Sequence, residues 1–125
     1  MDFSDFFEPL DLADFNYAGE QGPFRMGDLI KSYTEKNNFP DPEGADLVIL
    51  GVKEDRDSLN NEGCALAPDF VRKHLYSLYP GAFRPKIVDL GNIKAGFTIR
   101  DTYFAVASVL GEILEKNIIP IIIGG

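Results

Sequence analysis

Cysteine and basic residues are scarce in this chain of 125 residues, and each shortage excludes a class of protein. Cys64 is the single cysteine, so no internal disulfide framework can form. The 12 lysines and arginines stand against 20 aspartates and glutamates, and the net charge of −8 argues against nucleic acid, whose phosphates require a basic face. No apolar run approaches the roughly 18 residues of a membrane span, and the acidic start Met1–Asp5 lacks the basic residues of a signal peptide. We therefore expect a cytoplasmic protein that binds neither nucleic acid nor membrane.

The first 44 residues differ from the rest and are predicted to form an arm. No basic residue precedes Arg25, and aromatic side chains alternate with the carboxylates there, among them Phe3, Phe15 and Tyr17. Because disordered chains rarely contain so many aromatics, we expect the arm to pack over the domain or over a partner subunit. It is expected to be irregular apart from a helical turn and a short helix at Gly27–Thr34.

Residues 45–125 alternate between strand and helix patterns, which predicts one α/β domain. Continuous apolar runs, typical of buried parallel strands, lie at Asp46–Val52, Lys86–Gly91 and Ile118–Gly125. A helix is predicted to begin at Pro68, and a second at Thr98, where Asp101 completes a capping box. Right-handed crossovers between such strands give a parallel sheet covered by helices.

Helical periodicity predicts which side of each helix is buried. In the first helix the expected apolar face excludes Arg72 and Lys73 and consists of Val71, His74, Leu75 and Leu78. In the second helix the expected stripe consists of Tyr103, Val106, Ala107, Leu110, Ile113 and Leu114.

Few residue types that carry chemistry are present, and each also has a structural interpretation. His74 is interpreted as a packed or half-buried structural histidine, since no second ligand stands at metal-binding spacing. Cys64 is interpreted as a small packing residue, because no neighbouring basic residue lowers its pKa. A solvated loop is favoured over a calcium site for the carboxylates Glu54, Asp55 and Asp57, whose spacing does not match a calcium loop.

Two strand ends offer further candidates. Asp89 lies near the end of a predicted strand, where α/β enzymes place functional side chains and where aspartates also cap loops. Gly124 and Gly125 follow the last strand and allow a sharp turn or a close approach to a ligand. They lack the further glycines of a nucleotide fingerprint.

In order along the chain, these segments resemble the amino-terminal part of the ureohydrolases, the family of arginase, agmatinase and formimidoylglutamase, with the formimidoylglutamase-like branch the most similar. The resemblance covers about Ala45 to Gly125. It rests on Val48-Ile49-Leu50-Gly51-Val52, Gly63, Ala67-Pro68, Val71-Arg72, Val88-Asp89-Leu90-Gly91-Asn92-Ile93 and Ile119-Pro120-Ile121-Ile122-Ile123-Gly124-Gly125. Asn92 stands where the family more often has aspartate.

The resemblance implies a three-layer α/β/α fold, of which this chain holds about three parallel strands in the order 2-1-3. It also implies hydrolysis of a guanidino or formimino group of a small molecule by two Mn²⁺ ions about 3.5–4 Å apart. The family's first metal ligand follows the paired glycines, so no catalytic residue and no metal ligand is assigned within this chain. Gly124 and Gly125 are expected to lead into the metal-ligand loop, and the loop Lys53–Ala67 to line the active-site mouth with its substrate candidates Asn60, Asn61, Glu62 and Gly63.

This chain alone is therefore expected to be an inactive amino-terminal part of a metal-dependent hydrolase. A complete, non-catalytic binding or assembly module is the first alternative, and a small nucleotide-binding domain of flavodoxin type is the second. The apolar strand Ile118–Gly125 is also expected to be an exposed edge that promotes self-association or is covered by the arm.

Overall fold

Three long parallel strands form the centre of the molecule. The computed structural model describes residues 3–13, 15 and 23–124. In it β3 (Leu47–Val52) pairs in parallel with both β4 (Ile87–Ile93) and β5 (Ile119–Gly124). The spatial order β4-β3-β5 is the predicted order 2-1-3, because β3 is the first of the three along the chain. The α/β fold with a parallel central sheet is thus confirmed.

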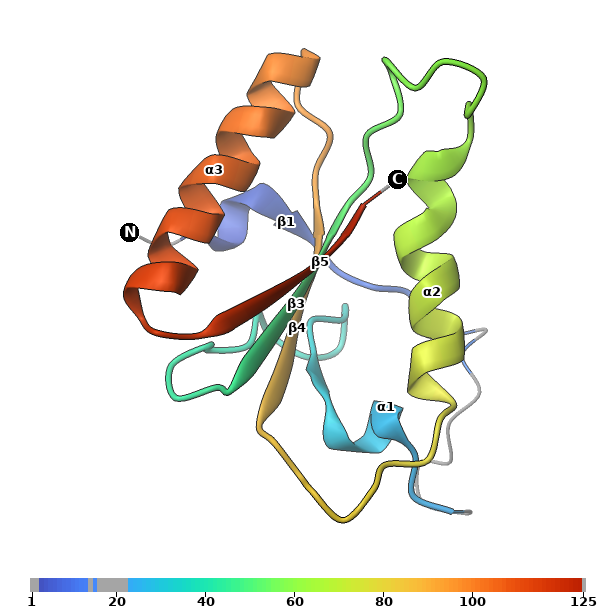
Figure 1. Ribbon diagram of the computed structural model, residues 1–125, viewed down its shortest axis with the longest axis vertical. Helices are drawn as coiled ribbons and strands as arrows, with labels where there is room; N and C mark the ends of the chain where they lie inside the picture. Colours follow the sequence, from blue (N-terminus) through green and yellow to red (C-terminus); the bar gives the residue numbers. More distant parts are fainter. Residues whose placement is uncertain (1–2, 14, 16–22, 125) are drawn as a thin grey trace.

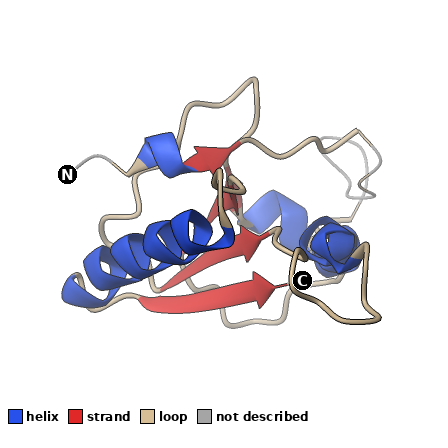
Figure 2. Cartoon of the chain, turned by 90° about the horizontal axis from the view of Figure 1, so that it is seen from above, coloured by secondary structure: helices blue, strands red, loops and turns tan. Residues whose placement is uncertain are grey.

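Helices cover both faces of this sheet and give three layers. Figures 1 and 2 show α3 (Ile99–Glu115) on one side of the strands, with α2 (Ala67–Tyr76) and the short α1 (Met26–Leu29) on the other. Successive residues of β3 point to opposite faces of the sheet. Val48 and Leu50 accordingly join the core under α3, whereas Ile49 joins the core under α2.

The amino-terminal arm adds two short strands to the same sheet. After the 3-10 turn η1 (Ser4–Phe6), β1 (Phe7–Glu8) pairs antiparallel with β4, and β2 (Lys31–Ser32) pairs with β4 in parallel. Phe3 and Phe7 are buried and contact Phe39, with ring centroids 6.1 and 5.4 Å away. The described part of the arm therefore packs on the domain, as expected. Tyr17 and the rest of residues 16–22 lie outside the described residues.

The predicted helix Gly27–Thr34 is wrong in its extent. α1 ends at Leu29, and the following residues extend to pair with Val88 and Asp89 of β4. Hydrogen bonds to a distant strand thus override the local helical pattern.

The predicted helix starts are correct, but the predicted buried faces are correct only in part: Leu75 of α2 packs against the core, whereas Val71 and Leu78 are exposed. Pro68 lies in the first turn of α2, and the Thr98 side chain accepts a hydrogen bond from the Asp101 backbone at the start of α3. The residues buried in α2 are Pro68, Arg72 and Tyr76, so the exclusion of Arg72 from the buried face was wrong. His74 is exposed rather than packed, with its ring 4.9 Å from that of Phe70.

The buried face of α3 is also rotated from its predicted position. Tyr103 and Leu114 are exposed, whereas Ile113 is buried as expected. The other buried residues of the helix are Thr102, Ala105 and Val109. Thr102 is buried because its hydroxyl has polar partners in the loops that precede α3, a cause that hydrophobic periodicity does not register.

β5 is the open edge of the sheet, although its sequence is that of a buried strand. Ile119, Ile121 and Ile122 are 62%, 41% and 46% exposed, because no strand among the described residues covers the outer side of β5. The expectation of an exposed apolar edge is therefore confirmed for this chain. In the described part of the chain, no helix has both the length and the apolar character that crossing a membrane requires.

Candidate functional site

The carboxyl ends of β3, β4 and β5 meet on one side of the molecule. In Figure 1 this side is at the top, where the green loop after β3 and the orange loop after β4 extend beyond the sheet. Ligands of open α/β sheets bind at this side, outside the carboxyl ends of the strands. It is therefore the candidate functional side of the molecule.

A polar cluster joins the two loops at this side. The Glu54 carboxylate accepts hydrogen bonds from Arg56 Nε at 2.7 Å and from Thr102 Oγ1 at 2.8 Å, and also from Arg56 Nη2. Arg56 Nη1 donates to the Phe97 carbonyl at 3.0 Å, and the Gly96 N–H donates to Thr102 Oγ1 at 2.8 Å. The loop after β3, the loop after β4 and the start of α3 are thus connected through side chains.

Glu54 is ionised throughout the physiological range. Hydrogen bonds from Arg56, with a smaller contribution from Thr102, lower the pKa of its carboxyl from 4.5 to about 2, against the opposing effect of burial. The same pairing raises the pKa of Arg56. Because its charge is already balanced by this guanidinium, Glu54 is suited to holding the loops rather than to accepting a proton.

The predicted substrate residues lie at the tip of the loop after β3, which is closed by Asp55. Asp55 Oδ2 accepts hydrogen bonds from the Gly63 N–H at 2.9 Å and from the Ala65 N–H at 3.3 Å. All four candidates, Asn60, Asn61, Glu62 and Gly63, are exposed. Asn60 and Gly63 adopt left-handed backbone angles, with φ of 62° and 95°, which turn the chain at the tip.

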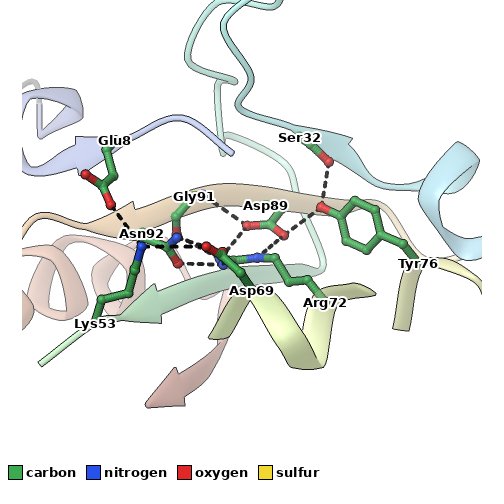
Figure 3. Close-up of polar contacts among 9 residues, drawn as sticks. All are labelled: Glu8, Ser32, Lys53, Asp69, Arg72, Tyr76, Asp89, Gly91 and Asn92. Atoms are coloured by element: carbon green, nitrogen blue, oxygen red, sulfur yellow. Dashed lines mark hydrogen bonds and ion pairs between the residues drawn. The ribbon is translucent and has the colours of Figure 1, made fainter. Parts of the chain in front are cut away.

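A second polar cluster, which sequence reasoning missed, is buried between α2 and β4 (Figure 3). The Arg72 guanidinium binds the Asp89 carboxylate in a bidentate manner, with Nε and Nη2 2.8 and 3.0 Å from the two oxygens. Both side chains are fully buried. Arg72 Nη1 also donates to Asn92 Oδ1 at 2.5 Å, and Nη2 donates to the Gly91 carbonyl at 2.9 Å. The functional alternative for Asp89 therefore loses support, since its carboxylate neutralises a buried arginine.

The rest of this cluster fixes the aspartate from the other side. Tyr76 Oη donates to Asp89 Oδ2 at 2.7 Å and lies 2.7 Å from Ser32 Oγ. Burial, together with the neighbouring Asp89 charge, raises the pKa of Tyr76. Near the surface, Lys53 Nζ lies 3.7 Å from carboxylate oxygens of both Glu8 and Asp69. The sequence did carry signals of this cluster: Asp89 lies near a strand end, and Arg72 and Tyr76 lie one helical turn apart on α2.

The described residues do not fit a binuclear manganese site. Among them, no three histidine, cysteine, aspartate or glutamate side chains gather as a metal-binding group. The carboxylate of Glu54 faces Arg56, that of Asp89 faces Arg72, and that of Asp69 faces Arg72 and Lys53, so each already has a cationic partner. No catalytic step through a metal is therefore derived for the described residues.

The remaining candidates are separate from both clusters. Cys64 is half-buried, and its Sγ lies 3.4 Å from Ser58 Oγ. Gly124 ends β5 at the functional side, and a Cβ added there would meet no atom within 4 Å. Gly125 lies outside the described residues. The structure thus brings Gly124 and the loop after β3 to the same end of the sheet.

Comparisons with known proteins agree with this architecture. The chain is 27% identical over 95 residues to the mitochondrial guanidino acid hydrolase of Mus musculus, an alignment that covers 67% of this chain. The chain spans about a quarter of the length of that relative, 26%. No solved structure matches the chain significantly. The model of the arginase family matches residues 45–125, which include all three long strands and both long helices, and the chain accordingly belongs to the arginase family.

Proposed function

We propose that this chain is the first part of a metal-dependent hydrolase that cleaves a guanidino or formimino C–N bond of a small molecule. The observation that carries the proposal is the arginase-family match over residues 45–125, the part of the chain that contains the three parallel strands and the loop at their carboxyl ends. The name of the mouse relative, a guanidino acid hydrolase, favours a guanidino substrate over a formimino one.

In this proposal the chain supplies the frame of the site, and the catalytic metals, two Mn²⁺ ions, are held by sequence outside residues 3–124. The proposal assigns the tip Asn60–Gly63 to the substrate entrance. The proposal also assigns Gly124, the last residue of β5, and Gly125 after it in the sequence to the approach to the metal-ligand loop. It follows that the chain by itself has no hydrolase activity. A cytoplasmic location stays a prediction from the composition, to be checked by fractionating cells that contain the protein.

The test compares this chain with the longer protein that contains it. Both are incubated with Mn²⁺ and, separately, with arginine, agmatine, a guanidino acid and formimidoylglutamate. Hydrolysis of a guanidino group releases urea, whereas hydrolysis of a formimino group releases formamide, so the product identifies the substrate class. We expect turnover by the longer protein only, abolished by a chelator. Turnover by this chain contradicts its inactivity, and a longer protein inert on every substrate contradicts the proposed reaction.

A second candidate function, assembly, is favoured by the open edge of β5. The Ile119 N–H donates to the Asp46 carbonyl at 3.3 Å, so alternate residues of β5 bond to β3. The N–H and the C=O of Ile122 consequently point to the open side of β5. Pro120 faces the same side but has no N–H, so it presents only its carbonyl there. We propose that a second copy pairs here in the antiparallel direction, about a two-fold axis at Ile122, where the two copies of this residue exchange hydrogen bonds.

The state of association tests this second proposal. Ile122→Lys places a charge on the edge and is expected to shift a concentration-dependent dimer toward monomer in sedimentation experiments. Leu59→Lys is the matched control, because Leu59 is 86% exposed in the loop after β3 rather than on the edge. A wild-type chain that stays monomeric at millimolar concentration contradicts self-association.

A further inference from the structure

Two consecutive carboxylates organise the loop after β3 in different ways. Glu54 is nearly buried, with 6% of its side chain exposed, and its carboxylate binds Arg56 in the same loop and Thr102 of α3. Asp55 instead binds within the loop, to the backbone of Gly63 and Ala65, eight and ten residues later in the sequence. Glu54 therefore anchors the base of the loop, and Asp55 closes the loop upon itself.

The anchor also extends to the neighbouring loop. Arg56, which balances the charge of Glu54, donates to the Phe97 carbonyl in the loop after β4. Thr102 accepts the Gly96 N–H from that same loop while donating to Glu54. Removing the Glu54 carboxylate therefore removes the acceptor shared by Arg56 and Thr102, the two side chains that contact the loop after β4.

The closure by Asp55 depends on charge-assisted hydrogen bonds to two backbone N–H groups, which are stronger than bonds between neutral groups. Such a closure restricts the intervening residues, including the exposed tip Asn60–Gly63, before any ligand is present. A ligand that meets an ordered loop avoids the entropic cost of ordering it. Asp57, in the same loop, is exposed, and no hydrogen bond or ion pair of its side chain is observed among the described residues.

We propose that Glu54 and Asp55 are positioning residues that hold the tip Asn60–Gly63 in one conformation at the carboxyl side of the sheet. The binding of a small guanidino or formimino substrate by this tip rests on the proposed function. The positioning itself is a property of this chain and is tested without any substrate.

Amide hydrogen exchange of the 125-residue chain tests the closure. Asp55→Ala is expected to accelerate exchange at the Gly63 and Ala65 N–H groups by about tenfold or more, since each loses a bond to a charged acceptor. Asp55→Asn retains an oxygen acceptor and is expected to restore much of the protection. Asp57→Ala is the matched control and is expected to leave both amides unchanged.

Exchange within β3 serves as the reference in every variant, so that general destabilisation is distinguished from local opening. Unchanged exchange at Gly63 and Ala65 in Asp55→Ala overturns the proposed closure. Equal acceleration in Asp57→Ala overturns it as well, because the effect would then come from loop charge in general.

Glu54→Ala tests the connection between the two loops. We expect faster exchange at the Gly96 N–H, which lies in the loop after β4 and makes no direct contact with Glu54. Asp57→Ala is again the control. If Gly96 exchanges at the wild-type rate in Glu54→Ala, the connection is refuted.

Kinetics of the longer protein distinguish positioning from a purely structural role. For a substrate that it hydrolyses, Asp55→Ala is expected to raise KM about tenfold with little change in kcat, and Asp55→Asn to restore KM. An unchanged KM in a variant whose loop exchanges faster overturns the positioning role. If the wild-type enzyme hydrolyses none of the substrates, the proposed function fails, and the exchange experiment alone decides the closure.

Discussion

Replacing Arg72 by methionine removes one side of the buried ion pair between α2 and β4. Methionine fills a similar volume but leaves the Asp89 carboxylate, among the described residues, with the Tyr76 hydroxyl and the Gly91 N–H as its hydrogen-bond donors. Both members of the pair are fully buried, so water does not replace the lost guanidinium. The variant therefore isolates an uncompensated charge inside the protein.

The expected loss of stability is large relative to the total stability of a small domain. Breaking a buried pair by removing one partner costs about 3–5 kcal/mol, whereas the total stability of such a domain is about 5–15 kcal/mol. Arg72→Lys keeps the charge but loses the bidentate contact with Asp89, so its stability should lie between those of the wild type and Arg72→Met. This variant stays measurable even where Arg72→Met does not fold.

Urea denaturation, monitored by circular dichroism, measures these differences. Small proteins lose about 1–3 kcal/mol of stability per molar urea, so Arg72→Met should lower the midpoint by at least about 1 M. Lys73→Met is the control, because its exposed side chain lies next to Arg72 on the same helix. A cost for Arg72→Met within about 0.5 kcal/mol of that control refutes the reasoning. The double variant Arg72→Met/Asp89→Asn should be less destabilised than the sum of its parts.

Three further predictions concern other parts of the molecule. The pKa of Glu54 is lowered from 4.5 to about 2, so its contribution to stability is present above pH 4.5 and is lost as the pH falls toward 2. Glu54→Gln should lower the free energy of unfolding by about 1–2 kcal/mol at neutral pH, a modest value because Arg56 is partly exposed. In urea titrations this difference from wild type should disappear as the pH falls toward 2, and a constant difference contradicts the prediction. A Cβ at Gly51 would collide with Asn92 Oδ1 and lie 2.9 Å from Pro68 Cβ, so Gly51→Ala should cost about 1–3 kcal/mol in thermal unfolding. Gly111→Ala, which meets no atom within 4 Å, should instead stabilise α3, and equal effects of the two variants refute the packing argument. Thr98→Ala should cost about 1 kcal/mol through loss of the helix cap, Thr98→Ser should retain it, and equal melting temperatures of the two variants refute the capping role.

Local sequence signals were sufficient for the main elements of the fold. The runs of β-branched residues in β3 and β5 specify strands because such side chains suit an extended backbone. Thr98 marks a helix start because its side chain accepts a hydrogen bond from a free N–H group of the first turn. Pro68 marks a helix start because it has no N–H group that would need a partner there. The alternation of strand and helix predicts a parallel sheet, and the order β4-β3-β5 was expected from the family resemblance.

The candidate site was only partly accessible in this way. Its location in the loop after β3 follows from the strand that precedes it, and the residues Asn60–Gly63 were named from the sequence. The contacts that hold this loop were not foreseen, because Glu54 binds Thr102, which lies 48 residues further along the chain. Charged residues in a polar loop look alike in sequence, whether they bind within the protein or remain in solvent.

By itself, the sequence determined the three long strands and the helix starts, which depend on residues close together in the chain, and the membership of the arginase family, which depends on the motifs along residues 45–125. Tertiary structure decided which helix faces are buried, and Arg72 shows the reason. A lone arginine is expensive to bury, so periodicity assigns it to solvent, but Asp89 brings an opposite charge from a different element and makes the buried position stable. β1 and β2 also lie far from β4 in the sequence, and their pairing with it depends on backbone partners that only the folded chain brings together.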